Sequence, residues 1–112
     1  MAAASAIAVQ TGATLAESLP SRCLVVRTEG DERRTFRADF DVGRQADLVI
    51  GDDFASSRHA RFHVAHGLWY VEDRRSTNGT WLNGRRIHGP QRVKKGDKIR
   101  IGHTVITVVS AT

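Results

Sequence analysis

With 112 residues, the chain is long enough for one domain with one hydrophobic core and too short for two. Its single cysteine, Cys23, excludes an internal disulfide and a metal site built from cysteines, and no run of 18 or more apolar residues is available for a membrane-spanning helix. The 17 Lys and Arg residues outnumber the 12 Asp and Glu residues, and the resulting charge of +5 favours an anionic partner.

The first 20 residues differ in composition from the rest of the chain. Residues 1–20 are rich in Ala, Ser and Thr, contain one charged residue, Glu17, and end at Pro20. This composition predicts a disordered or weakly ordered tail, followed by a folded domain over residues 21–112. The segment lacks the positively charged start of a signal peptide, so we expect a cytoplasmic protein.

From Ser21 onward, short runs of β-branched and aromatic residues alternate with turn residues, which is typical of an all-β sandwich or barrel. Asn83-Gly84 lies between two such runs and is a strong hairpin signal, because both residues accept positive φ. The pattern predicts eleven strands: Arg22–Thr28, Arg33–Ala38, Phe40–Arg44, Asp47–Ile50, His59–His66, Leu68–Asp73, Thr80–Asn83, Arg85–Ile87, Arg92–Val93, Lys98–Ile101 and Thr104–Val109.

Two predicted connections are longer than the rest, Gly51–Arg58 and Arg74–Gly79. Hairpin loops usually have about two to five residues, so the extra length suggests a function. Two predicted strands separate these loops, and an antiparallel meander would therefore bring both loops to the same end of the domain. The same count does not place Arg44.

The sequence offers no convincing catalytic or metal site. His63 and His66 lie three residues apart in an alternating strand, so they face opposite sides and cannot chelate together. Ser56, Ser57 and His59 lack a readable third group to orient the histidine. Glycine loops of the nucleotide-binding types are absent. We therefore expect a protein that is not an enzyme and has neither a metal nor a cofactor.

Anion binding fits the two long loops better. Their hydroxyls, loop amides and guanidinium groups are the donors that a phosphate dianion needs. These donors are Ser56, Ser57 and Arg58 in the first loop, and Arg74, Arg75, Ser76, Thr77 and Asn78 in the second. The alternative is that Ser, Thr and Asn only form turns, and composition leaves both interpretations open.

Several short motifs together resemble one known family. They are Val42-Gly43-Arg44, Ser56-Ser57-Arg58-His59, the stretch Asp73–Thr80, Gly96-Asp97 and Ile101-Gly102. In this order and spacing, from about Leu24 to Val109, the chain resembles the forkhead-associated (FHA) domain. The resemblance implies a phosphothreonine-binding fold: a two-sheet antiparallel β-sandwich of about eleven short strands, with recognition loops at one end.

The resemblance also assigns roles to individual residues. Arg44, Ser56 and Thr77 would bind the phosphate, whereas Ser57 and Asn78 would contact the main chain of the bound peptide. Three further residues would support the pocket without touching the ligand: Gly43, His59 and Gly79.

The chain departs from the family pattern at two places. The family often has arginine directly after the pocket serine, whereas here Ser57 intervenes before Arg58. The family's usual Leu-Gly after Asp73 is replaced by Arg74-Arg75, and arginine tolerates positive φ poorly. These three arginines beside the expected pocket predict a preference for acidic residues flanking the phosphothreonine. Solvated surface arginines are the alternative.

The resemblance implies a phosphothreonine-containing partner, either a Ser/Thr kinase or one of its substrates. Because no apolar run is long enough to span a membrane, we expect no membrane partner. Phosphorylation of Thr11 or Thr14 in the tail could allow self-binding, with an inert arm as the alternative. Two rival functions stay open: an interaction domain with a degenerate pocket, and a module that binds nucleic acid. The second rests on a basic surface formed by Arg85, Arg86, Arg92, Lys94 and Lys95.

Overall fold

The computed structural model describes residues 22–112, so the predicted tail over residues 1–20 lies outside the described residues. The described part is all-β, with eleven strands in two sheets, and it confirms the predicted fold class. One sheet has the order β2 (Arg33–Phe36), β1 (Leu24–Arg27), β11 (Thr104–Ala111), β10 (Lys98–Ile101), β7 (Thr80–Leu82) and β8 (Arg85–Arg86). The other has the order β4 (Leu48–Val49), β3 (Phe40–Gly43), β5 (Ala60–Ala65), β6 (Leu68–Asp73) and β9 (Gln91–Arg92).

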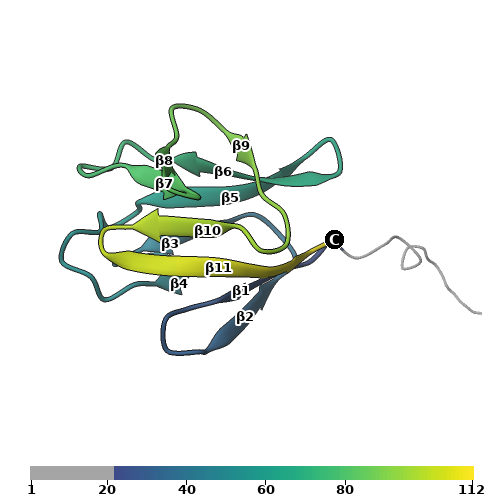
Figure 1. Cartoon of the computed structure of the whole chain (residues 1–112), viewed down its shortest axis with the longest axis horizontal. Helices are drawn as coiled ribbons and strands as arrows, with labels where there is room; N and C mark the ends of the chain where they lie inside the picture. Colours follow the sequence, from purple (N-terminus) through teal and green to yellow (C-terminus); the bar gives the residue numbers. More distant parts are fainter. Residues whose placement is uncertain (1–21) are drawn as a thin grey trace, which may run out of the picture.

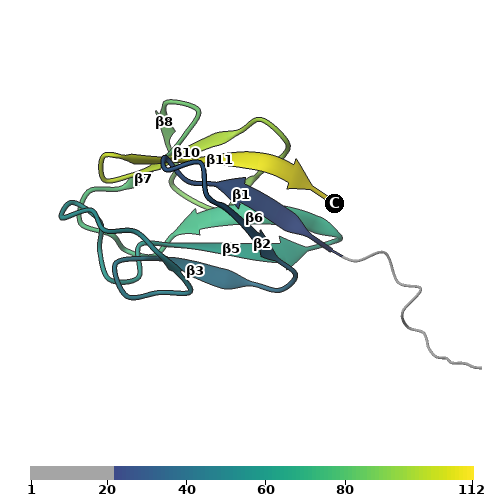
Figure 2. The same ribbon diagram turned by 90° about the horizontal axis from the view of Figure 1, so that it is seen from below.

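The two sheets pack face to face and bury the core between them. Figure 2 shows them edge on, with β10 and β11 in one layer and β3 and β5 in the other. The ring of Phe40 stacks on that of Phe62, with centroids 4.9 Å apart, and both side chains are buried with Ile99 and Ile106 of the opposite sheet. Along β5, Ala60 and Phe62 face this core because side chains alternate between the two faces of a strand.

The pairing of β3 with β4 is parallel, whereas every other pair of strands in the two sheets is antiparallel. The chain therefore returns between Gly43 and Leu48 before it forms β4 in the same direction. As a result, the end of β3 and the end of β4 point to the same end of the sandwich. If β3 and β4 were antiparallel, the residues after β3 and the residues after β4 would lie at opposite ends of the sandwich.

The hairpin predicted at Asn83-Gly84 is present between β7 and β8. Asn83 has φ of 50° and Gly84 has φ of 86°, so both residues use the left-handed conformation that this short turn requires.

The described chain begins and ends at one end of the sandwich. The backbone amide of Thr112 donates to the carbonyl of Cys23 at 2.9 Å, and Cys23 donates back to Thr112 at 3.3 Å. In Figure 1 the C-terminus lies at the right, whereas the β10–β11 turn and the long loops lie at the left.

Candidate functional site

Three loops meet at the end of the sandwich opposite the C-terminus. They are residues 44–47 after β3, residues 50–59 after β4 and residues 74–79 after β6. The parallel β3–β4 pair and the antiparallel β5–β6 pair direct all three to this end. We call this set of loops the rim.

The loop after β3 is bonded directly to the loop that contains Ser56. The amide of Arg44 donates to the carbonyl of Ser56 at 3.1 Å, and the amide of Gln45 donates to the carbonyl of Ser57 at 3.0 Å. Glycine is required at position 43, since a Cβ atom there would lie 2.3 Å from the carbonyl oxygen of Ser57 and 2.7 Å from that of Ser56. The structure thus brings Arg44 and Ser56 together through their backbones.

His59 connects the second loop with the third. Its side chain is fully buried, and its Nδ1 accepts a hydrogen bond from the amide of Ser56 at 3.0 Å. Its Nε2 lies 2.7 Å from the carbonyl oxygen of Gly79, which can only accept. These two contacts select the neutral tautomer with the proton on Nε2. The imidazole therefore fixes the distance between the two loops.

Two more hydrogen bonds join the second and third loops at the surface. The hydroxyl oxygen of Ser56 accepts from the amide of Thr77 at 3.2 Å, and the side-chain Nδ2 of Asn78 donates to the carbonyl of Phe54 at 2.9 Å. Because Ser56 accepts with its oxygen, its hydroxyl proton is left to donate elsewhere.

In the described part of the chain, the guanidinium of Arg44 is unpaired at the rim. Arg44 is exposed, and within residues 22–112 its side chain has no hydrogen bond or ion pair. An arginine side chain without an internal partner can turn toward an external anion without breaking a contact in the folded protein.

Asp73 holds the third loop in shape. Its carboxylate accepts from the amide of Ser76 at 3.1 Å, from the Ser76 hydroxyl, and from the Thr80 hydroxyl at 2.7 Å. The Ser76 hydroxyl oxygen also accepts from the amide of Gly79 at 2.9 Å. Burial alone would raise the pKa of Asp73, but the hydrogen bonds from Ser76 and Thr80 outweigh it and hold the pKa below its ordinary value.

Acidification is expected to weaken the fold through Asp73. A carboxyl group with a lowered folded pKa stabilises the protein above its ordinary pKa of about 4 and loses that contribution as the pH falls through the folded value. Urea unfolding at about pH 7 and about pH 3 should therefore show that Asp73→Asn is less stable than wild type at the higher pH and loses less stability between the two. Asp53→Asn, in an exposed residue of the neighbouring loop, is the matched control. Equal losses in wild type and Asp73→Asn would contradict the assignment.

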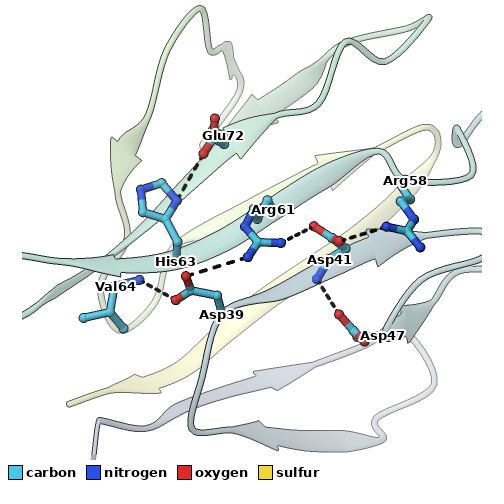
Figure 3. Close-up of polar contacts among 8 residues, drawn as sticks. All are labelled: Asp39, Asp41, Asp47, Arg58, Arg61, His63, Val64 and Glu72. Carbon is cyan, nitrogen blue, oxygen red and sulfur yellow. Dashed lines mark hydrogen bonds and ion pairs between the residues drawn. The ribbon is translucent and has the colours of Figure 1, made fainter.

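The three arginines expected beside the pocket occupy different surroundings. Arg58 lies 3.8 Å from Asp41, on the outer face of the second sheet, where Arg61 also binds Asp41 at 3.1 Å (Figure 3). Arg74 and Arg75 are exposed in the third loop. Arg75 has φ of 57°, so it adopts the left-handed conformation for which the family pattern has glycine.

A fourth segment at this end was not predicted from the sequence. The carboxylate of Asp52 accepts from the amide of Phe54 at 2.8 Å, from the amide of His103 at 2.7 Å and from the hydroxyl of Thr104 at 2.8 Å. It thereby fastens the β10–β11 turn to the second loop, and these hydrogen bonds, that from Phe54 first, lower the pKa of Asp52. The signal available in the sequence was an aspartate at the start of a loop, because Asp side chains there commonly accept a hydrogen bond from the amide two residues later in an Asx turn.

Within residues 22–112, no group of three or more His, Cys, Asp or Glu side chains could hold a metal ion. The same residues include no helix long and apolar enough to cross a membrane.

Comparison with known proteins gives a consistent result. The family model described as FHA domain matches residues 40–102. The chain is 48% identical to FhaB of Mycobacterium tuberculosis over 67 residues, which cover 58% of this chain and 43% of FhaB. It is 36% identical to the oxoglutarate dehydrogenase inhibitor of Corynebacterium glutamicum over 96 residues, which cover 80% of this chain and 66% of the inhibitor. The chain thus spans less than half the length of FhaB.

Solved structures extend the similarity to three dimensions. Rv1747 FHA-1 of Mycobacterium tuberculosis superposes with a TM-score of 0.68 at 31% identity, over 80% of this chain and 98% of that one. The FHA domain of FhaA, solved in complex with the intracellular domain of Rv3910, superposes with a TM-score of 0.67 at 27% identity, over 76% and 98% of the two chains.

Proposed function

Because this chain belongs to the FHA domain family, we propose that it binds a phosphorylated threonine of a partner protein at the rim and thereby acts as an interaction module in kinase signalling. The family is a class of non-enzymatic interaction domains, and catalysis has no part in the proposal. The phosphothreonine itself is bound by the loops after β3, β4 and β6.

The convergence of unlike donors at the rim supports the proposal most directly. Arg44, Ser56 and Thr77 come from three separate loops, yet two hydrogen bonds connect them through Ser56. The Arg44 amide donates to the Ser56 carbonyl at 3.1 Å, and the Thr77 amide donates to the Ser56 hydroxyl oxygen at 3.2 Å. A phosphothreonine carries about −1.5 to −2 charges and three acceptor oxygens. A guanidinium fork and the hydroxyls of Ser56 and Thr77 complement such a group.

Each donor has a distinct role in the proposed complex. Arg44 binds two phosphate oxygens through its planar guanidinium, and the Ser56 hydroxyl donates its remaining proton to another. Asn78 contacts the peptide main chain: its Nδ2 is held by Phe54, which directs the amide group and leaves Oδ1 to accept a peptide N–H. Ser57 contacts the peptide beside it.

The proposed partner is a protein phosphorylated on threonine, either a Ser/Thr kinase or one of its substrates, in the cytoplasm. The chain's relatives support this choice. EmbR of Mycobacterium tuberculosis was solved in complex with a phosphopeptide, and FhaA with the intracellular domain of Rv3910.

Titration with one peptide in three forms tests the proposal. The phosphothreonine form is expected to bind, and the unmodified threonine form to show no measurable binding. The phosphoserine form should bind about ten- to a hundredfold more weakly, because a methyl group that fits an apolar slot adds about 1–3 kcal/mol of binding free energy. Isothermal titration calorimetry measures all three. Equal binding of the threonine and phosphothreonine forms would sink the proposal.

Nucleic acid is the competing ligand in this test. If the basic surface around Arg85 and Lys94 binds nucleic acid as the main function, affinity for a duplex or single strand will exceed that for the phosphopeptide and fall steeply with salt. Phosphothreonine would then have no effect on it.

A further inference from the structure

A groove lined by charged side chains of both signs lies beside the rim, between the third loop and the segment after β8. The groove has a volume of about 430 Å³, and its charged lining consists of Glu72, Asp73, Arg75, Arg86 and His88. We call it the side groove. It combines one arginine from loop 74–79 with one from β8 and a histidine from the following turn.

The two carboxylates of the side groove are committed elsewhere. Asp73 accepts hydrogen bonds from Ser76 and Thr80, as described above. Glu72 is directed toward the outer face of its sheet, where its Oε1 lies 3.3 Å from Nδ1 of His63 (Figure 3). Both carboxylates keep their negative charge, but neither lies within ion-pair distance of Arg75 or Arg86.

The two arginines of the side groove are correspondingly unpaired. Over residues 22–112, neither Arg75 nor Arg86 has a carboxylate within ion-pair distance or a side-chain hydrogen bond. Unpaired guanidinium groups can bind an anionic ligand without breaking a contact in the folded protein. Arg75 and Arg86 are therefore available to bind an acidic group of another molecule.

The side groove is continuous with the rim through Gly79. A Cβ atom on Gly79 would lie 2.7 Å from Nε of Arg86, so the guanidinium packs directly against this backbone. On the other side, the carbonyl of the same residue faces His59, which supports Ser56. One extended peptide can therefore contact both sites across the short loop 74–79.

We propose that the side groove binds a second acidic group of the phosphothreonine-containing partner, through Arg75 and Arg86 with His88 as an additional donor. The ligand is an anionic oxygen group, either a Glu or Asp carboxylate or a second phosphate. Two guanidinium forks suit both, since each can make parallel hydrogen bonds to a pair of oxygens. This inference rests on the proposed function and assigns the acidic preference to the side groove instead of to Arg58, whose guanidinium is already near Asp41.

The test uses one phosphothreonine peptide with otherwise neutral residues, in which a single Glu or a second phosphothreonine is moved stepwise along the flanks. Wild type is expected to gain about three- to tenfold in affinity at one offset, with the larger gain for phosphate, because it carries more charge. The double variant Arg75→Gln, Arg86→Gln should lose that gain and keep its affinity for the neutral-flank peptide. Because glutamine removes the guanidinium that packs against Gly79, unchanged affinity for the neutral-flank peptide also checks that the rim keeps its shape.

Arg33→Gln is the matched control, since Arg33 is exposed on β2, at the opposite edge of the same sheet from β8. It should leave the gain intact. An equal loss in the control would mean general attraction of charge and overturn the side groove, as would the absence of a gain at every offset. If the neutral-flank phosphothreonine peptide itself fails to bind wild type, the proposed function fails first.

Discussion

Replacing Arg44 with alanine is expected to lower the affinity for a phosphothreonine peptide by at least about 30-fold and to leave the folded protein intact. Truncating one partner of a hydrogen-bonded charge pair costs about 2–5 kcal/mol of binding free energy. The fold should not suffer, because Arg44 is exposed and its side chain has no partner within residues 22–112. The hydrogen bond from its amide to the carbonyl of Ser56 is made by the backbone and is kept in the variant. Calorimetric titration and a thermal melt measure the two effects separately.

Two variants distinguish a specific role of Arg44 from a loss of charge. Arg44→Lys keeps the charge and removes the planar fork, so it should bind more weakly than wild type and more tightly than Arg44→Ala. Arg33→Ala removes an equal charge on a distant edge strand and should bind as wild type does. Affinity that is unchanged in Arg44→Ala would show that the phosphate is bound elsewhere.

Gly43→Ala is expected to damage both the fold and the binding site. The added methyl group would lie 2.3 Å and 2.7 Å from two backbone carbonyl oxygens, those of Ser57 and Ser56, and backbone cannot rotate away as a side chain can. Overpacking of this kind costs about 1–3 kcal/mol of the free energy of unfolding. Because the loop that must move contains Ser56, the affinity for the phosphothreonine peptide should fall as well.

Gly51→Ala provides the control for Gly43→Ala, since a Cβ on Gly51 meets nothing within 4 Å although the residue begins the same loop. Urea unfolding should place Gly51→Ala near wild type and Gly43→Ala clearly below it. Similar stability of the two variants would show that the loop yields to the methyl group, and the close approach at position 43 would then have no structural importance.

The sequence predicted the strands well because their signals are local. Alternation along β5 and the Asn83-Gly84 turn depend on residues two to four positions apart, and both are present in the structure. The direction of pairing is not local. The parallel β3–β4 pair depends on how the chain returns between Gly43 and Leu48, and no periodicity encodes this. Counting strands therefore could not place Arg44, whose backbone the structure bonds to Ser56.

The sequence predicted which side chains could bind an anion, but not the hydrogen bonds that connect the loops carrying them. The resemblance assigned roles to Ser56, Asn78 and His59 that stay predictions, and the structure adds how these side chains are held. It was silent on Asp52, whose partners His103 and Thr104 follow about 50 residues later in the chain. The sequence also did not predict that Arg58 lies next to Asp41, seventeen residues earlier. This contact forms only because β3 and β5 are adjacent in the sheet.

The position of the C-terminus sets a minimum tether for any ligand attached to it. Thr112 is bonded to Cys23 at the end of the sandwich away from the rim, and the eight residues of β11 separate it from Thr104, which Asp52 fastens to the second loop. At about 3.4 Å per residue, this span is about 27 Å. A phosphothreonine fused after Thr112 through fewer than about eight extended residues cannot reach the rim of its own domain. Such a fusion would bind a neighbouring copy and assemble head to tail, whereas a longer tether would allow it to close on itself.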